Sequence, residues 1–375
     1  MLCSICGSES HYIFTQDTVC GNGNFRGSVS FKRCGFCTHL EKQVDDVYLG
    51  AAADLYNRDY SEVGASKIKV NADGTVASRS ELLATYIAKD VVPKEKTRRV
   101  FSIIDFGAGG GGLINALRTK LSEAYLIGVE FSEHSRSNIL SNGADVFVLN
   151  TDIDSLDSVD LIILSHTLEH IPDPLQLLKQ LRSKLKPNGN LICLVPNSGV
   201  VWSDVTVFEH IHHFTPSSLI NLFTLAGFAV SIVPDYASSQ SEIAIIAQNK
   251  EGSERAFSRL GKPSSFSYEV LPSYINIFLR DIDNQVSRII KRKIKFSIFG
   301  QGGTGIFLVG KYASNILSII DEDPTKFNLR FNGIIIDNLD TTPPCTPVYI
   351  AFNNFLASEV IKSKVRGMRP DLEIL

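Results

Sequence analysis

Short apolar runs recur through the middle of the chain and alternate with stretches of helical periodicity, such as LINALRTKL and LQLLKQLRSKL. Each run ends in polar or glycine-rich sequence, which is typical of buried strands that lead into loops. In chain order the runs are VFSIIDF, AYLIGVE, DVFVLN, VDLIILS and LICLVPN. The segment AGFAVSIVPDYASSQSEIAIIAQNK adds two strands joined by a polar turn. The pattern predicts an α/β fold over residues 100–250.

Four further segments flank this region. Residues 1–45 hold HYIFTQDTV and GSVSFKR, two short strands around the turn-prone GNGN. Residues 46–99 are expected to form a helical lid or linker, and residues 251–293 a helical connector. In residues 294–375 the strand IKFSIFG leads into a glycine-rich turn and a helix, and FNGIIIDN supplies another apolar strand. We therefore expect an N-terminal ribbon, a central α/β sheet and a smaller C-terminal Rossmann-like α/β domain.

The composition is that of an ordinary globular protein. Hydrophobic residues make up 44% of the 375 residues and charged residues 21%, so wholesale disorder and a membrane bundle are both disfavoured. A net charge of −3 offers no overall attraction for a nucleic-acid backbone. The N-terminal MLCSICGSES lacks the pattern of a signal peptide, and seven cysteines cannot all pair within one chain. These features predict a cytoplasmic protein that binds neither nucleic acid nor membranes.

The first forty residues carry two CxxC pairs. Each pair can form a tight knuckle that directs two thiolates at one ion, and two knuckles complete the tetrahedral sulfur shell of a structural zinc site. The predicted ligands are Cys3, Cys6, Cys34 and Cys37. Free buried thiols are the alternative, and they leave the paired spacing unexplained. Cys20 is interpreted as a bystander, and His11 and His39 as less favoured replacement ligands.

The first strand of the central region runs into a glycine-rich turn. Glycines let a strand-to-helix turn approach a ligand closely and adopt positive φ. Glu130 ends the next strand, about 20 residues on, where a carboxylate can accept hydrogen bonds from ribose hydroxyls. Asp152, next to the end of the third strand, could reach an adenine amino group. The predicted nucleotide-binding residues are Asp105, Gly107, Gly109, Gly110, Gly111, Glu130 and Asp152.

These features, with HTLEHIPDP and KPNGNLICLVPN, resemble the core of the class I S-adenosylmethionine-dependent methyltransferases. The dinucleotide dehydrogenases share the glycine turn and the ribose acid but lack the LEHIPDP loop and the KPNG turn. The resemblance implies S-adenosylmethionine as the cofactor and an antiparallel hairpin that closes the sheet. A Rossmann domain that binds another adenine nucleotide is the alternative.

The cysteine pairs ahead of this core resemble the zinc-bearing C-methyltransferases of deoxysugar pathways, which act on nucleotide-activated ketosugars. In that family a Glu-His pair after the fifth strand belongs to the catalytic loop, and Glu209 and His210 match it. Val207 and Phe208 stand where the family usually has a tyrosine. His170 matches a second active-site histidine, and Tyr60 the tyrosine of the N-terminal lid. The alternatives are loop packing for His210 and core packing for Tyr60.

The family also carries a C-terminal Rossmann-like domain, and the second glycine turn of this chain lies in the matching region. Its backbone amides and helix start favour an anion such as a nucleotide diphosphate. The candidate residues are Gly300, Gly302, Gly303, Thr304 and Gly305. A packing turn without a ligand is the alternative.

Methylation at carbon requires a base, because a carbon next to a ketone becomes nucleophilic only after it loses a proton. His210, oriented by Glu209, is the expected base, and His170 or Tyr60 the donor to the enolate oxygen. His212 and His213 are expected to be structural or substrate-facing, and Glu169 to cap the following helix. Three functions follow: a nucleotide-sugar C-methyltransferase, an O- or N-methyltransferase acting on a saccharide or other small metabolite, and a noncatalytic nucleotide-binding protein. The sequence leaves the oligomeric state open.

Overall fold

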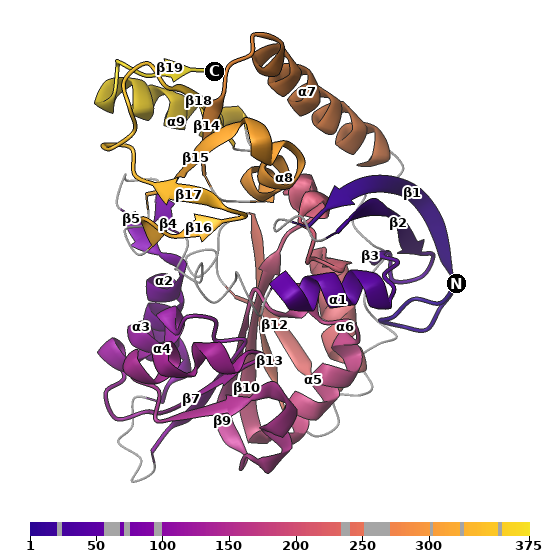
Figure 1. Cartoon of the computed structure of the whole chain (residues 1–375). Coiled ribbons are helices and arrows are strands. Elements are labelled where there is room, and N and C mark those ends of the chain that lie inside the picture. Colours follow the sequence, from indigo (N-terminus) through magenta and orange to yellow (C-terminus); the bar gives the residue numbers. More distant parts are fainter. Residues whose placement is uncertain are drawn as a thin grey trace.

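The structure is a computed structural model that describes residues 1–20, 25–55, 68–70, 76–93, 100–233, 241–250, 271–300, 303–322, 326–351 and 355–375. Within these residues the chain forms sheets of seven, six and four strands and one two-stranded sheet. Figure 1 shows the seven-stranded sheet at one end of the molecule and the six-stranded sheet at the other, with the N-terminal sheet along one side. The active-site candidates of the sequence lie mainly on the seven-stranded sheet.

The seven-stranded sheet has the order β12-β13-β10-β9-β6-β7-β8. Its strands are β6 (Ser102–Phe106), β7 (Tyr125–Glu130), β8 (Val146–Leu149), β9 (Val159–Ser165), β10 (Leu185–Pro196), β12 (Ala229–Ile232) and β13 (Glu242–Gln248). The first five are parallel, and β13 pairs antiparallel with both β10 and β12. The predicted parallel sheet with a closing hairpin is thereby confirmed.

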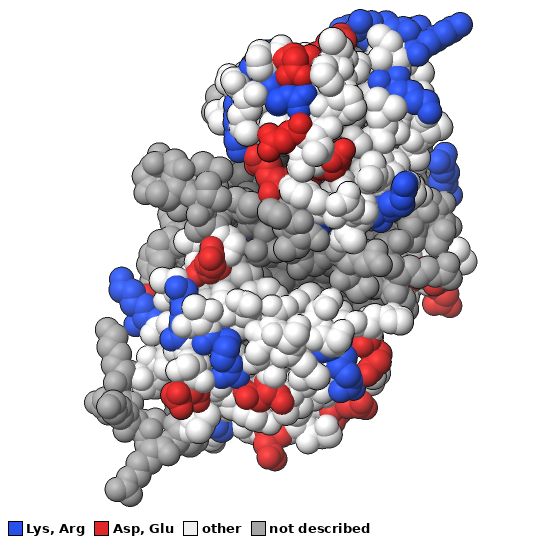
Figure 2. Space-filling model, turned by 60° about the vertical axis from the view of Figure 1, so that its left-hand side comes forward, with Lys and Arg blue, Asp and Glu red and all other residues white. Residues whose placement is uncertain are grey.

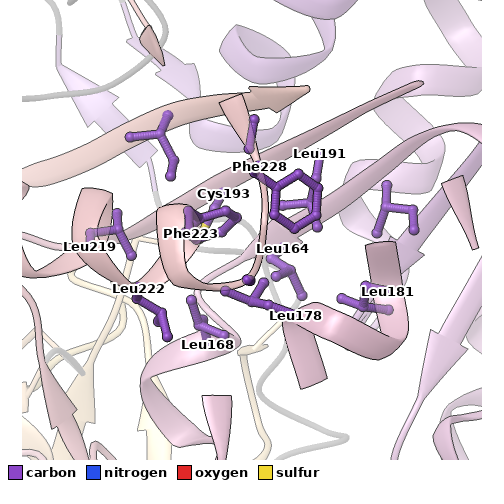
Figure 3. Packing of buried hydrophobic residues seen from close by; sticks show 14 of the residues in the cluster. Leu164, Leu168, Leu178, Leu181, Leu191, Cys193, Leu219, Leu222, Phe223 and Phe228 are labelled. Carbon is purple, nitrogen blue, oxygen red and sulfur yellow. The ribbon is translucent and has the colours of Figure 1, made fainter. Parts of the chain in front are cut away.

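Alternation along the strands gives the sheet two apolar faces. Phe106, Ile162 and Leu164 pack on one face, against α5 (Pro174–Ser183) and α6 (Pro216–Leu225). Their odd-numbered neighbours Leu161 and Ile163 pack on the other, against α2 (Arg79–Tyr86) and α3 (Gly112–Lys120). Figure 3 shows the first of these clusters, in which leucines of α5 and α6 surround Cys193 and Phe223. This double covering is why the strand sequences are apolar throughout.

Helix boundaries in the core follow local capping. Asp173 caps α5 by accepting a hydrogen bond from the Gln176 amide, with Pro174 at the first turn. Glu169 therefore does not cap this helix, contrary to the expectation from sequence. Thr215 caps α6 in a capping box with Ser218. The remaining helices of this region are α4 (Arg136–Ser141) and the short 3-10 segments η3 (Glu133–Ser135), η4 (Asn150–Ser155), η5 (Leu168–His170) and η6 (Trp202–Thr206).

The N-terminal sheet has the order β1-β2-β3-β11. Its hairpin is β1 (Ser10–Val19) and β2 (Arg26–Cys34), followed by β3 (Leu40–Lys42) and helix α1 (Asp46–Leu55). The fourth strand, β11 (His212–His213), comes from the loop after β10 and pairs antiparallel with β3. The ribbon sheet therefore extends beyond the predicted 1–45 segment, because residues of the central region complete it.

The predicted helical segment 46–99 also contains strands. Besides α1 and α2 it holds the hairpin of β4 (Ile68–Val70) and β5 (Val76–Ser78), and α2 continues as a π-helical turn, η2 (Ile87–Val91). β-Branched residues at three of the six strand positions favour this extended structure. Ser78 and Glu81 form a capping box at the start of α2.

The C-terminal sheet has the order β16-β17-β15-β14-β18-β19. Its strands are β14 (Phe296–Phe299), β15 (Ile316–Ile320), β16 (Arg330–Phe331), β17 (Ile334–Asp337), β18 (Pro347–Ile350) and β19 (Glu373–Ile374). The helices are α7 (Leu271–Lys291), α8 (Gly303–Tyr312) and α9 (Phe355–Met368), with the 3-10 turn η9 (Ala313–Asn315). The pairings of β14, β15, β17 and β18 are parallel. The expected Rossmann-like C-terminal domain matches this arrangement.

One apolar cluster joins the ribbon to the C-terminal sheet. It contains Tyr48 of α1 and Phe208 of the loop before β11, together with Phe296 and Phe307 of the C-terminal sheet and α8. The Arg26 guanidinium also donates to the carbonyl oxygen of Gly310 at 3.1 Å. The ribbon lies along one side of the molecule and packs against both larger parts (Figure 1).

The surface is mixed in charge. On the face shown in Figure 2, acidic and basic side chains are interspersed among uncharged ones over both ends of the molecule. This mixture agrees with the overall charge of −3. Among the described residues, no helix is both long enough and apolar enough to cross a lipid bilayer.

Candidate active site

A cavity of about 360 Å³ lies beside the carboxyl ends of β6, β7 and β9. Strand β6 lies between β7 and β9, at the point where the strand order reverses, which is where open α/β sheets bind ligands. Helix α1 covers part of the cavity with small apolar side chains. The lining residues are Leu49, Ala52, Ala53, Gly107, Gly109, Glu130, Phe131, Ser132, Ser135, His166, Thr167, His170, Ile171, Pro172, Glu209 and Ile211.

The glycine turn forms one wall of this cavity. Gly107 has φ 81°, and a Cβ atom there would lie 2.3 Å from Thr167 Oγ1. Only glycine satisfies both the backbone angle and the close approach. Gly111, with φ 83°, starts α3. Gly107 and Gly109 line the cavity as predicted, whereas Gly110 and Gly111 are not among its lining residues.

Glu130 is held at the cavity by two backbone amides. Its Oε2 accepts from Gly109 N at 2.6 Å and its Oε1 from Phe131 N at 2.7 Å. Burial raises the pKa of Glu130, and the two amide hydrogen bonds oppose that rise. Each carboxylate oxygen keeps a further lone pair for a ligand hydroxyl. The turn and the acid thus fit the ribose of an adenosyl group.

The other two predicted acids do not line this cavity. Asp105 is buried in β6, where burial and then the charge of Glu130 raise its pKa to about 7. Asp152 is exposed on η4. The sequence correctly placed Asp152 at the carboxyl edge of the sheet, after β8. The 3-10 turn η4 then directs its side chain into solvent.

The loop from Asp204 to His213, called here the acceptor loop, contains a carboxylate–histidine pair that the sequence analysis missed. Asp204 Oδ1 lies 2.5 Å from Nδ1 of His210. Burial lowers the pKa of His210, but the Asp204 carboxylate more than offsets this, so the pKa is raised above the usual value. Because Nδ1 faces a carboxylate, Nε2 is the nitrogen left for proton transfer.

Asp204 fixes the rest of the loop as well. Its Oδ2 accepts from Ser198 Oγ at 3.0 Å and lies 2.8 Å from Nδ1 of His213. His213 is fully buried, and burial lowers its pKa to about 4. His212 is also buried, with Nδ1 2.9 Å from Nε2 of His39. Both histidines therefore have structural positions, and His39 lies outside the cysteine cluster.

Glu169 occupies the centre of a histidine group and is fully buried. Its Oε1 lies 4.0 Å from Nε2 of both His170 and His210, and 3.2 Å from Nδ1 of His166. Burial raises the pKa of Glu169, but the hydrogen bond from His166 and the nearby imidazole charges lower it to about 2. Glu169 is therefore a fixed negative charge beside both candidate catalytic histidines.

His170 lines the cavity and contacts His210, which is not itself among the lining residues. Their ring centroids are 4.7 Å apart and their planes are nearly perpendicular, at 76°. Nδ1 of His170 donates to the carbonyl oxygen of Glu209 at 3.2 Å. Burial and then the charge of His210 lower the pKa of His170 to about 4. The structure thus brings together the two histidines that the sequence analysis singled out.

Glu209 does not take the orienting position expected of it. The Nδ1 atom of His210 faces Asp204, and the hydrogen bond between Glu209 and His170 uses the backbone carbonyl. The Glu209 side chain lines the cavity instead, and its Oε2 is buried without a hydrogen-bond partner among the described residues. A turn at Val207, whose carbonyl accepts from His210 N at 3.3 Å, rotates the imidazole away from its sequence neighbour.

His166 is a second residue that the sequence analysis missed. Its Nε2 lies 3.0 Å from Glu242, which also pairs with Arg79, and its side chain lines the cavity. Its φ of 56° lies in the left-handed region, which few residues other than glycine adopt. The SHTLEH segment carried a local signal in Glu169, three residues after His166, but the second carboxylate partner, Glu242, lies 76 residues away.

The four predicted cysteine ligands form one cluster. Their sulfur atoms lie within 4.8 Å of one another. Cys3 and Cys37 are 3.6 Å apart and Cys6 and Cys34 are 3.5 Å apart, while the amides of Phe36 and Cys37 each donate to Cys34 Sγ at 3.3 Å. Four sulfurs with amide support fit a closed tetrahedral zinc site. Cys20 is buried elsewhere, beside Ala51.

The remaining predicted residues are placed in part. Tyr60 and Gly302 lie outside the described residues. Gly300 has φ 100°, and Gly303 begins α8. A Cβ atom at Gly305 would lie 2.1 Å from the Gly300 carbonyl oxygen, so packing alone requires glycine there. The Thr304 hydroxyl is buried without a hydrogen-bond partner among the described residues. A nucleotide at this turn stays a prediction.

Comparison with known proteins identifies the central region. Residues 76–231 match the model of a methyltransferase-domain family. The ubiquinone biosynthesis O-methyltransferase of Coxiella burnetii (strain Dugway 5J108-111) is 33% identical over 163 residues, which are 41% of this chain and 63% of that protein. The probable polyketide synthase 1 of Dictyostelium discoideum is 23% identical over 157 residues, which are 33% of this chain and 5% of that protein.

This chain thus spans less than two thirds of the length of either relative. Among solved structures, the selenomethionine-substituted CurJ carbon methyltransferase has a TM-score of 0.39 and 16% identity, over 54% of this chain and 58% of that one. The family match and the strand order confirm the predicted class I methyltransferase fold of the central region.

Proposed function

We propose that the protein transfers the methyl group of S-adenosylmethionine to a small-molecule acceptor, because residues 76–231 match the model of a methyltransferase-domain family. The observation that carries this proposal is the convergence of Gly107, Gly109 and Glu130 on one cavity at the switch point of the sheet. When bound, S-adenosylmethionine supplies an electrophilic methyl group. Glu130 would accept from its ribose, and Gly107 would leave room beside Thr167.

We further propose that the acceptor is a carbon next to a ketone, in a nucleotide-activated sugar. His210 packs against His170, which lines the cavity, and Asp204 holds the tautomer of His210 in which Nε2 accepts a proton. In this proposal the C–H bond next to the ketone breaks, and its proton goes to His210 Nε2. The new C–C bond would form to the methyl group as its bond to sulfur breaks, which leaves S-adenosylhomocysteine. His170 could donate to the enolate oxygen only after it takes up a proton at Nε2, because its neutral ring uses the Nδ1 proton on the Glu209 carbonyl.

The roles of the neighbouring acids follow from their positions. Asp204 stabilises the imidazolium that forms at His210, and Glu169 adds a second negative charge 4.0 Å from Nε2. Glu209 lines the cavity, where its carboxylate is placed to accept from an acceptor hydroxyl. Tyr60, which lies outside the described residues, remains a second candidate donor.

Two features bear on the sugar proposal. The sulfur cluster of Cys3, Cys6, Cys34 and Cys37 fits the zinc site of the sugar C-methyltransferases that the sequence resembles. We propose that it holds one structural zinc ion, which takes no part in catalysis because its shell is closed. A nucleotide diphosphate at the turn of Gly300, Gly303, Thr304 and Gly305 is proposed on the same resemblance, although Gly305 has a packing role of its own.

Methylation at oxygen is the second candidate, because the Coxiella burnetii relative is by its name an O-methyltransferase. The test is the exchange of the substrate's α-proton in heavy water, without methyl donor. A carbon acceptor predicts exchange that depends on His210. Methyl transfer to a saccharide without any such exchange would favour oxygen, and failure to bind S-adenosylmethionine would contradict the methyltransferase proposal itself.

A further inference from the structure

We propose that Lys42, on strand β3 of the N-terminal sheet, is a positioning residue that holds the acceptor loop in its reactive conformation. This inference rests on the proposed function, since His210 belongs to that loop. Lys42 is 2% exposed and lies at the edge of the N-terminal sheet where β3 pairs with β11. Lys42 precedes in the sequence all the lining residues that the seven-stranded sheet and its loops contribute, which begin at Gly107.

The Lys42 side chain binds two consecutive carbonyl oxygens of the loop. Its Nζ donates to Val207 O at 2.5 Å and to Phe208 O at 3.1 Å. Its backbone amide donates to Ile211 O at 2.9 Å. Lys42 therefore contacts the loop on both sides of His210.

The Val207 carbonyl connects Lys42 directly to the catalytic turn. The same oxygen accepts from the backbone amide of His210 at 3.3 Å. The orientation of the Val207 carbonyl therefore determines the position of the His210 backbone. That position in turn determines whether Nδ1 of the imidazole reaches Asp204. A lysine that fixes the carbonyl thereby fixes the imidazole.

Tyr48 of α1 supports the same contact. Its hydroxyl donates to the Phe208 carbonyl and lies 3.3 Å from Lys42 Nζ. Its ring stacks on Phe208, with centroids 4.2 Å apart and planes 25° apart. The Phe208 carbonyl thus accepts from two buried donors. These contacts occur where the resembling family has a tyrosine in the loop itself.

A buried ammonium group is costly unless its partners repay the lost hydration. Burial lowers the pKa of Lys42 to about 7, while the charges of Asp204 and Glu209 oppose that shift. An apolar side chain of similar length would fill the space without this cost. Such a side chain would lack the N–H donors that Lys42 directs at the carbonyls of Val207 and Phe208.

The test replaces Lys42 with methionine, which keeps the length and removes the donors. We expect Lys42→Met to bind S-adenosylmethionine within about twofold of the wild type, because no cavity residue is changed. The rate of α-proton exchange and kcat should fall by about a hundredfold, the effect typical of a displacement near 1 Å at a reacting group. KM for the acceptor should change much less than kcat.

Lys32→Met is the matched control. Lys32 lies on the neighbouring strand β2, donates to Leu2 O at 2.8 Å and pairs with Glu41. Its charge acts on His212, but it makes no hydrogen bond to the acceptor loop among the described residues. Its methionine variant should keep the wild-type exchange rate. Wild-type exchange in Lys42→Met, or parallel losses of exchange and S-adenosylmethionine affinity, would overturn the positioning role.

A spectroscopic measurement keeps the inference testable if the wild type shows no exchange, which would instead count against the proposed function. In protein labelled with 15N-histidine, the proton between His210 and Asp204 is assigned by its loss in His210→Asn. We expect this signal to shift or broaden in Lys42→Met and to stay unchanged in Lys32→Met. An unchanged signal in both variants would overturn the inference independently of activity.

Discussion

Three carboxylates lie beside histidines at or next to the cavity, and each has a different effect on its histidine. Asp204 sets the tautomer of His210, Glu169 provides a charge 4.0 Å from its Nε2, and Glu242 holds His166 at the cavity wall. At His210 the charges of Asp204 and Glu169 favour the protonated imidazole and outweigh the effect of burial on its pKa. The proton affinity of the site is therefore set mainly by residues that do not touch the acceptor.

The pH dependence of α-proton exchange should report the pKa of His210. A base acts in its neutral form, so the exchange rate should rise with pH until it passes the pKa of His210, which Asp204 raises above the usual histidine value. Asp204→Asn should move this inflection to lower pH and lower the limiting rate by about a hundred- to ten-thousandfold, as loss of a base's function typically does. Rates measured between pH 5 and 9 in both proteins check this, and coincident inflections would contradict it.

Glu130 offers a prediction on affinity alone. Glu130→Ala removes the carboxylate that the Gly109 and Phe131 amides orient towards the cavity. Loss of a charged acceptor typically costs about 1.5–3 kcal/mol, which is about ten- to a hundredfold in affinity. Calorimetric titration with S-adenosylhomocysteine measures the change. Asp152→Ala is the control. Because Asp152 is exposed, this variant should bind S-adenosylhomocysteine with nearly the affinity of the wild type.

At the scale of elements, the short pairing of β3 with β11 carries much of the architecture. It joins the cysteine ribbon to the acceptor loop, with Glu41 opposite His212 and Leu40 opposite His213. Glu41 also accepts from the amide and the hydroxyl of Ser4, which lies between the first two cysteines. Glu41 therefore links the cysteine cluster to the acceptor loop, alongside the backbone pairing of β3 with β11.

We predict one zinc ion per chain, held by the four cysteines. Protein purified without added zinc should contain close to one equivalent by elemental analysis, and Cys34→Ser should lower both zinc content and thermal stability. Cys20→Ser is the control, since Cys20 lies away from the cluster and should keep the full equivalent. Folded wild-type protein with almost no zinc would contradict the prediction.

Sequence patterns predicted the elements that depend on neighbours along the chain. The parallel strands, the closing hairpin and the ribbon hairpin all have local signals of periodicity, and each is found. Gly107 and Glu130 were found because the turn and the strand end fix their positions. Asp204 was missed, and Glu209 given its role, because the turn at Val207 decides which acid meets His210. The contacts of Lys42 with residues more than 160 positions away have no local signal.

For the whole molecule, the important packing is at the junction of its three parts. Phe208 is 1% exposed and belongs to the cluster that contains residues of the ribbon, α1 and the C-terminal sheet. Its ring also contacts Phe25, with centroids 5.3 Å apart. A side chain at such a junction stabilises the association of all three parts, in addition to its own loop.

Phe208→Ala should therefore lower the free energy of unfolding of the whole chain. Truncation of a buried phenylalanine typically costs about 3–5 kcal/mol. Denaturant titration followed by far-ultraviolet circular dichroism measures the loss, and Phe36→Ala, at a position that is 60% exposed, should change stability little. Equal effects of the two substitutions would argue that the junction adds no stability.

The pairing of β11 with β3 also limits how such a chain can evolve by recombination. A gene segment that encoded the methyltransferase domain alone would carry β11 without its partner strand, and would leave the carbonyls of Val207 and Phe208 without Lys42. A segment that encoded the ribbon alone would leave the edge of β3 unpaired. Recombination that separated the two would damage both products, so we expect the ribbon and this acceptor loop to be inherited together as one unit.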